Sequence, residues 1–191
     1  LSLHDALPIY GFMKSDKKKE IVEELLDYHC PRYSELPNIP LYKDQVIVYI
    51  EEALSALNIN KDEMLLTPTM LNNYVKHKVL QPPVNKKYDR NHLSYLIVLC
   101  VFKQVFSISE ISELIKVQIG TYDVEEAYDY FCIELEKTIK FVFASNGGSE
   151  QSSAQKVTRE SELVRSAVLS VVNKIYIQYY LKERTLKQEL Y

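Results

Sequence analysis

Apolar residues recur at spacings of three and four along most of the chain, with charged residues between them. This spacing places the apolar side chains on one face of an α-helix. Each segment that carries the pattern predicts a helix, over residues 16–28, 41–57, 92–105, 109–119, 123–143 and 157–190. Glycine is scarce, at 4 of 191 residues, and few glycines favour helices over turn-rich sheet. The sequence therefore predicts an all-α fold.

Two of these helices carry broad apolar stripes. The stripe of helix 157–190 is too wide for exposure, so we expect it to pack on helix 123–143, on a second subunit, or on both. It consists of Val164, Val168, Val171, Val172, Ile175 and Tyr179. Helix 92–105 is expected to be a core helix through Leu93, Leu96, Ile97, Cys100, Val101 and Val105.

A shorter helix, over residues 68–77, is marked by its ends. Thr67 can cap the free N–H groups of a helix start, and proline is tolerated at the first helical position, here Pro68. The helix cannot continue through Pro82 and Pro83. We therefore expect a basic loop over residues 84–90, as a tight loop or a very short hairpin flanked by Val79/Leu80 and Tyr88. The expected caps of the following helices are Asp89 or Asn91, then Ser107 or Ser109, then Asp123.

Charge is unevenly distributed along this acidic chain. Residues 64–103 contain six Lys or Arg and one Asp, a net charge of +5, so the total of −3 leaves −8 for the remainder. A basic island in an acidic chain favours a local anionic partner such as nucleic acid. The alternative is a basic face that only meets water.

No motif for catalysis, metal binding or a cofactor is present. The three cysteines are widely spaced and the four histidines show no ligand pairing, so we expect no enzyme activity, no cofactor, no metal and no catalytic residue. The longest apolar run, residues 95–102, is far shorter than the ~20 residues that span a bilayer, so we expect no membrane association and a cytoplasmic protein. Four glutamates of one helix are expected on its solvated face: Glu125, Glu126, Glu134 and Glu136.

Four regions follow from these patterns. Residues 1–9, LSLHDALPI, match the translation of a widely used sequencing-library adapter, and we expect them to be an artefact. Residues 10–32 form an N-terminal helix and connector, and residues 33–119 a helix-turn-helix domain of DNA-binding type. Residues 120–191 form a helical dimerisation or effector region, and their Gly/Ser-rich stretch 145–155 reads as a flexible loop.

The stretch TPTMLNNYVKHKVLQPP, followed by KKYDRNHLSYL and FSISEISELI, resembles the DNA-binding half of MerR-type regulators. With SELPNIPLYKDQVIVYIEEAL it also resembles the YkrK-like bacterial family, whose function is not established. The resemblance implies a winged helix-turn-helix core with a short wing loop, followed by a C-terminal helical extension. Two positions depart from the MerR pattern: Asn72 replaces the usual Arg of the reading helix, and Lys78 replaces the Gly of the turn.

The sequence thus predicts a dimeric transcriptional regulator that binds double-stranded DNA through helix 68–77 and loop 84–90. The expected contact residues are Thr69, Asn72, Asn73, Tyr74, Lys76, Lys78, Lys86, Lys87, Tyr88 and Arg90. The C-terminal helices would form the homodimer, because paired half-sites need a two-fold protein. Their tyrosines could line a pocket for a small-molecule effector, although plain core packing is the favoured interpretation: Tyr122, Tyr128, Tyr130, Tyr176, Tyr179 and Tyr180. The alternative is a helical protein-interaction module that keeps the fold without binding DNA.

Overall fold

The computed structural model describes residues 16–61, 63–144, 153–154 and 156–188. The expectations for residues 1–9, and for nearly all of the loop 145–155, lie outside this part of the chain. The described helices are α1 (Asp16–Leu26), α2 (Lys43–Ala53), α3 (Pro68–Lys76), α4 (Arg90–Phe102), α5 (Ile108–Ile119), α6 (Val124–Phe143) and α7 (Arg159–Gln188). Two short strands are β1 (Leu41–Tyr42) and β2 (Lys87–Tyr88), and single 3₁₀ turns lie at Tyr33–Glu35 and Ser55–Leu57. The predicted helical fold is confirmed, with a small sheet added.

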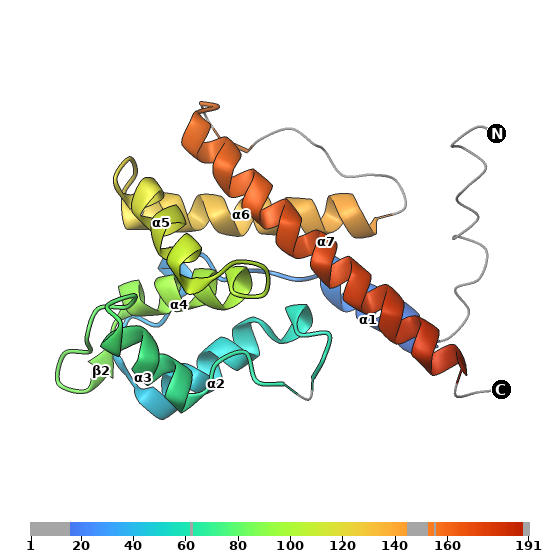
Figure 1. The fold of residues 1–191 in the computed structure, drawn as a ribbon, viewed down its shortest axis with the longest axis horizontal. Coiled ribbons are helices and arrows are strands. Elements are labelled where there is room, and N and C mark those ends of the chain that lie inside the picture. The colour runs from blue at the N-terminus through green and yellow to red at the C-terminus, as the bar shows by residue number, and fades with distance from the viewer. Residues whose placement is uncertain (1–15, 62, 145–152, 155, 189–191) are drawn as a thin grey trace.

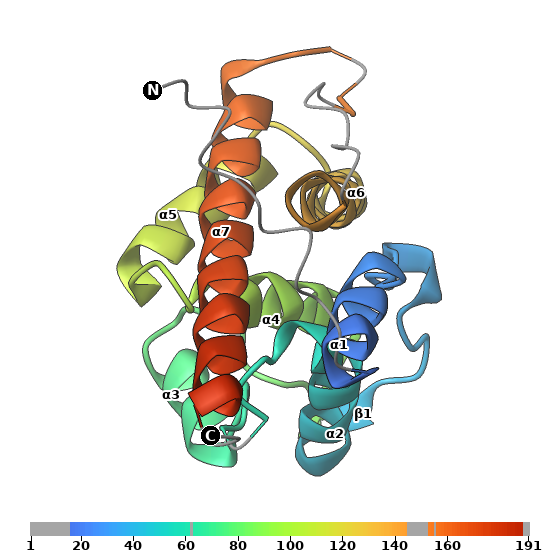
Figure 2. The ribbon, with the colours of Figure 1, turned by 90° about the vertical axis from the view of Figure 1, so that its right-hand side faces the viewer.

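Helix α4 lies at the centre of the molecule. The helices α2 and α3 lie on one side of it and α6 lies on the other, in both views (Figures 1 and 2). The long helix α7 crosses α6 and also packs on α4 and α5. The N-terminal helix α1 packs against α6. The predicted packing of the last helix on helix 123–143 is therefore present within one chain.

A single cluster of buried side chains runs through all of these layers. It includes Leu25 of α1, Leu71 of α3, Leu135 of α6 and Val171 of α7. The core residues predicted for α4 are buried except Val105, which is 42% exposed because the helix ends at Phe102 and turns away. The boundary predicted at residue 119 therefore lies inside one continuous core.

Side-chain caps set the starts of three helices. Thr67 accepts a hydrogen bond from the Met70 N–H at 3.2 Å, and Asp89 accepts one from the His92 N–H at 3.0 Å. Ser107 and Glu110 form a reciprocal capping box at the start of α5. At α6 the prediction is wrong in part, because Asp123 occupies the cap position without a side-chain capping hydrogen bond.

The small sheet joins segments on either side of α2 and α3. Strands β1 and β2 pair antiparallel, with Leu41 opposite Tyr88 and Tyr42 opposite Lys87. Of the two alternatives expected for residues 84–90, the tight loop is present, closed between Val84 and Lys87, and the hairpin flanked by Val79/Leu80 is not. The N–H groups of both residues already donate to the carbonyl oxygen of Tyr74, at 2.9 and 3.1 Å, which ends α3 and leaves neither N–H free for a ladder.

The expected solvated row of glutamates on α6 is wrong for two of its four members. Glu134 is 3% exposed and lies 3.3 Å from the Nε of Arg165 and 3.8 Å from the Nζ of Lys137. Glu136 is also mostly covered, because it binds the connector that precedes α2. Of the four, only Glu125 and Glu126 face water. Helical spacing alone does not distinguish these two exposed glutamates from the two covered ones.

Candidate nucleic-acid interface

Helix α3 presents one buried face and one polar face. Leu71 and Tyr74 point into the core, where Leu71 is fully buried. The opposite face is exposed and carries four of the predicted contact residues: Thr69, Asn72, Asn73 and Lys76. Their spacing of three, one and three places them along one side of the helix. The structure therefore brings these four side chains together on one surface, as predicted.

The end of α3 is fixed by a left-handed residue, Lys78, with a φ of 59°. The N–H of Lys78 donates to the carbonyl of Val75 at 3.0 Å, and that of Val79 donates to the carbonyl of Tyr74 at 2.9 Å. This pair of bonds is the Schellman motif, which glycine fills most often because it has no Cβ. A lysine is strained in this conformation, and Lys78 is exposed, as Lys76 is.

The loop expected to form a wing is a two-residue turn, and it is called the wing below. Val84 and Lys87 exchange backbone hydrogen bonds of 3.0 and 2.9 Å, and the residues between them, Asn85 and Lys86, have φ values of 50° and 63°. Two successive positive φ angles make a type I′ turn, which suits the twist of paired strands. Asn tolerates this conformation better than Lys does. All the non-glycine residues with positive φ in the described chain lie between residues 78 and 86.

The basic side chains near the wing fall into two groups. Lys76, Lys78 and Lys86 are exposed. Lys87 and Arg90 are partly covered, because Lys87 lies 4.9 Å from the ring centre of Tyr42 and Arg90 lies 5.5 Å from that of Tyr33. These cation–π contacts keep the two charged groups against aromatic rings, so Lys87 and Arg90 are less exposed than the other three.

The sixth cation of the basic segment is not part of this surface. The ammonium group of Lys103 donates to the carbonyl of Leu65 and lies 3.6 Å from the sulfur of Met70. Burial lowers the pKa of Lys103. This lysine closes the long connection between α2 and α3, whose residues Leu57, Ile59, Leu65 and Leu66 are buried.

The profile of a known protein family matches residues 31–131. The chain belongs to the DUF1836 family. This family is described as a domain of unknown function. Searches of curated proteins and of solved structures found no match. The DUF1836 match begins in the connector before α2, contains α3 and both strands, and ends inside α6.

Two of the predicted contact residues lie inside the DUF1836 core. Tyr74 is 6% exposed and Tyr88 is 4% exposed. Burial raises the pKa of both hydroxyl groups, for Tyr74 to well above its ordinary value. Their side chains therefore pack beneath α3 and β2 in the core. Only the other predicted contact residues can lie on the outer surface.

At the start of α4, the buried ring of His92 contacts the exposed carboxylate of Asp89, a pair that was not expected from the sequence. Asp89 follows β2 directly, and its Oδ1 lies 2.6 Å from the Nδ1 of His92. Burial disfavours the charge of Asp89, but the hydrogen bonds from the His92 backbone and side chain outweigh this and lower its pKa. The His92 ring also packs edge-on against Tyr88 at 5.4 Å. Through these contacts, His92 of α4 attaches the end of β2 to α4 within the DUF1836 domain.

The described residues form neither a metal site nor a membrane-spanning helix. No group of His, Cys, Asp or Glu there is arranged to hold a metal ion. Within that part of the chain, none of the helices combines the length and the apolar character needed to cross a membrane. Cys30, Cys100 and Cys132 are buried free thiols, and burial raises the pKa of Cys100 to about 12.

Proposed function

We propose that the protein is a cytoplasmic transcriptional regulator that binds double-stranded DNA through a MerR-like winged helix-turn-helix. The observation that carries this proposal is the exposed polar face of α3, together with the exposed lysines at the end of that helix and at the turn 84–87. Four exposed polar residues of α3 lie on one face, and exposed lysines flank that face at the helix end and at the turn. A polar helix with flanking cations is the arrangement that reads a major groove.

The side chains of this surface suit a division of labour. Asn72 and Asn73 can each pair with an adenine edge through two hydrogen bonds, and Thr69 can contact either base type. The ammonium groups of Lys76 and Lys86 can contact phosphates on either side. Because Lys78 and Lys86 occupy strained backbone conformations that glycine would fill more readily, their side chains have a reason to be there other than stability.

A second copy of the chain would supply the two-fold symmetry of a paired DNA site. Helix α7 buries one stripe against α6 but leaves Ile177, Tyr180 and Leu181 exposed on another. These residues are spaced by three and one, so they form a compact apolar patch on one side of the helix. We propose that two such patches meet in a homodimer.

The test is an unbiased selection of random duplex DNA by the purified protein at two salt concentrations. Recovery of a palindrome whose binding weakens steeply with salt would support a dimeric regulator. Recovery of duplexes without any sequence preference would refute the base-reading role of α3. A failure to retain DNA even at low salt would refute the proposal as a whole.

A specific surface favours the alternative, a protein-interaction module. Three apolar side chains are exposed here: Ile39 before β1, Tyr42 in β1 and Val48 in α2. A shallow groove of about 470 Å³ beside them is lined by Leu41, Val48 and Tyr49 together with the acids Asp44 and Glu52. An apolar groove with an acidic rim suits a basic amphipathic segment of a partner protein. Capture of such a partner with no retention of DNA would favour this alternative.

A further inference from the structure

The linker that leads into α3, residues 58–66, is held by side chains from four other helices. The structure describes all of its residues except residue 62. The four contacts are Glu24 with Lys61 at 3.3 Å from α1, Glu51 with the Leu66 N–H at 2.8 Å from α2, Lys103 with the Leu65 carbonyl from α4, and Lys182 with the Ile59 carbonyl at 2.7 Å from α7. The placement of the linker therefore depends on segments that lie far from it in the sequence.

The contact from α7 joins two parts of the molecule that have different proposed roles. The ammonium group of Lys182 donates to the carbonyl of Ile59, which lies 123 residues earlier in the chain. Ile59 is only 5% exposed, so this part of the linker is anchored in the core. Lys182 follows directly after Leu181, which belongs to the exposed apolar patch proposed for the dimer. Lys182 therefore connects the linker to the part of α7 that is proposed to meet a second copy.

A series of contacts continues from the linker to the first turn of α3. The side-chain amide of Asn58 donates to the carbonyl of Glu63 at 2.8 Å and so bridges the two halves of the linker. At the end nearer α3, the ammonium group of Lys103 donates to the Leu65 carbonyl and lies 3.6 Å from the sulfur of Met70. Met70 lies in the first turn of α3. Contiguous contacts of this kind can carry energetic coupling between distant elements.

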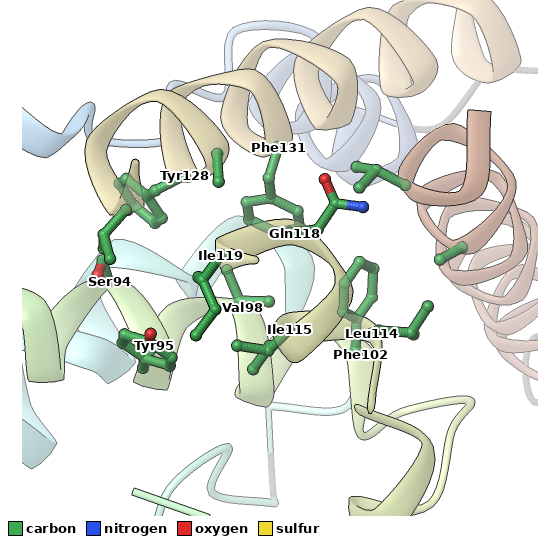
Figure 3. Close-up of a pocket in the computed structure, with 14 residues that line it drawn as sticks. Ser94, Tyr95, Val98, Phe102, Leu114, Ile115, Gln118, Ile119, Tyr128 and Phe131 are labelled. Atoms are coloured by element: carbon green, nitrogen blue, oxygen red, sulfur yellow. The ribbon is translucent and has the colours of Figure 1, made fainter. Parts of the chain in front are cut away.

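The packing of α7 on α5 is less complete. A small apolar cavity of about 60 Å³ lies where α4, α5, α6 and α7 meet, and α7 lines it with Val164 and Ala167. Figure 3 shows Val98, Ile115 and Phe131 around this space. Atoms that line an empty space lack partners on one side. Helix α5 therefore has room to adjust when α7 shifts, whereas the linker is bonded to α7 directly.

This cavity also bears on the tyrosines that could line an effector pocket. Tyr128 lines the cavity, whose volume is far below the ~300–1,000 Å³ typical of small-molecule sites. The other tyrosines with assigned contacts bond Thr158 and Ser161, or pack on Phe143. Packing within the helical region therefore describes these tyrosines better than a ligand site does.

We propose that Lys182 is a positioning residue that ties α7 to the start of α3. In a dimer assembled through α7, this tie fixes the separation of the two copies of α3, and hence the half-site spacing that the dimer accepts. Lys182 acts in this way without touching DNA. Its role in half-site spacing rests on the proposed DNA binding and the proposed dimer, whereas the tie within one chain does not.

The first measurement compares the binding of the full chain to two duplexes, a palindrome recovered by the DNA selection and a duplex that carries one of its half-sites. Lys182→Met keeps an unbranched side chain but removes the ammonium donor. It should weaken binding to the palindrome about ten-fold, because the two copies of α3 are no longer held at one separation. Binding to the single half-site should stay unchanged, because Glu51 and Lys103 still hold the end of the linker next to α3.

Lys174→Met is the matched control. Lys174 lies about two turns earlier on α7, and it also donates to a backbone carbonyl, that of Gln104 after the end of α4. This substitution removes the same charge from the same helix but leaves the bond to the linker intact. The affinities for both duplexes should therefore stay at the wild-type values. Sedimentation velocity should show the same oligomeric state for the wild type and for both variants.

A second measurement tests the tie without DNA. The N–H groups of Glu63 and Leu66 donate to the Asn60 carbonyl and to the Glu51 carboxylate. Exchange of these two amide protons with solvent deuterium should be faster in Lys182→Met than in the wild type, because the linker has lost its bond to α7. In Lys174→Met the exchange of both protons should match the wild type.

Several results would overturn the proposal. They are an unchanged affinity of Lys182→Met for the palindrome, equal losses on the two duplexes, equal losses in the two variants, a change of oligomeric state in Lys182→Met, and unchanged exchange of the two amide protons. A wild-type chain that retains no DNA would instead refute the proposed function and, with it, the role in half-site spacing. The exchange measurement would then decide the tie on its own.

Discussion

Arg32 and Glu136 form a forked ion pair, with Nη1 2.8 Å from Oε1 and Nη2 2.8 Å from Oε2. The backbone N–H of Cys30 donates to the same carboxylate at 2.9 Å. Both side chains are mostly covered, so the pair is screened less than a surface pair. It fixes the connector that precedes α2, where the DUF1836 match begins, to a part of α6 just beyond the end of that match.

The Arg32–Glu136 pair should stabilise the fold. Glu136→Gln should lower the free energy of unfolding at pH 7 by about 2 kcal/mol, because Arg32 keeps its covered position but loses its anionic partner. Urea denaturation measures the change. Glu125→Gln removes an exposed carboxylate from the same helix and should have little effect. Equal losses in the two variants would contradict the assignment.

The stability lost in Glu136→Gln should also depend on pH. Burial alone would raise the pKa of the Glu136 carboxyl, but the hydrogen bonds from Arg32 and Cys30 outweigh it and lower the pKa below its ordinary value of 4.5. The ionised form is therefore favoured in the folded state. Its contribution is complete above pH 4.5 and is lost as the pH falls through the lowered folded pKa. The difference between wild type and Glu136→Gln should accordingly shrink between pH 5 and about pH 3.

The left-handed end of α3 predicts a stabilising substitution. Lys78→Gly should raise the free energy of unfolding by about 0.5–1 kcal/mol, because glycine adopts a φ of 59° without strain. Lys76→Gly, two residues earlier and inside the helix, should lower it by about 1 kcal/mol. Thermal unfolding of both variants checks the pair. If both variants were destabilised, the left-handed backbone at Lys78 would be wrong.

The wing predicts a sequence-independent contact. Lys86→Ala should weaken binding to every duplex and reduce the slope of log K against log salt by about 1. Fluorescence anisotropy over a range of salt concentrations measures this slope. Lys140→Ala makes the same change of charge on α6 and should leave the slope unchanged. An unaltered slope for Lys86→Ala would remove the wing from the interface.

The exposed face of α3 predicts a sequence-dependent contact. Asn72→Ala should cost about 1–3 kcal/mol on the preferred duplex and relax the preference at a single base pair. Repeating the duplex selection with the variant identifies that base pair. Asn173→Ala removes an exposed Asn from α7 and should retain the wild-type preference. An unchanged preference in Asn72→Ala would show that this side chain does not read a base.

The apolar patch on α7 predicts the oligomeric state. Leu181→Glu should convert the proposed dimer to a monomer, because two introduced carboxylates would face each other across the two-fold axis. Sedimentation velocity measures the change. Val117→Glu places the same group at an exposed apolar position on α5 and should leave the dimer intact. A wild-type chain that sediments as a monomer would contradict the dimer directly.

The features that depend on local sequence could be predicted. The cap at Thr67, the polar face of α3 and the left-handed position of Lys78 all follow from spacing, turn chemistry or the family resemblance. Each is decided by residues within one or two turns of the chain. The apolar stripe of α7 and its packing on α6 could be predicted for the same reason.

The features that depend on long-range partners could not be predicted. Glu136 and Arg32 are separated by 104 residues, and nothing in the repeat pattern of α6 distinguishes Glu136 from Glu125. The partner of β2 is β1 and not Val79/Leu80, because the end of α3 had already taken the N–H groups that a hairpin needs. The sequence shows no partner for His92 at ligand spacing, and its contact with Asp89 is visible only in the structure.

The pairing of β1 with β2 closes the chain into a loop that holds α2, α3 and the wing. Opening the two-strand ladder would release the start of α2 and the start of α4 in one event, since each strand adjoins one of these helices directly. Amide protons of Leu41 and Tyr88, which lie opposite each other, should therefore exchange with solvent deuterium at similar rates, as members of one cooperative unit. Binding of a ligand at the wing would slow the exchange of both amide protons. It would thereby protect an amide of β1, the strand that is not part of the wing.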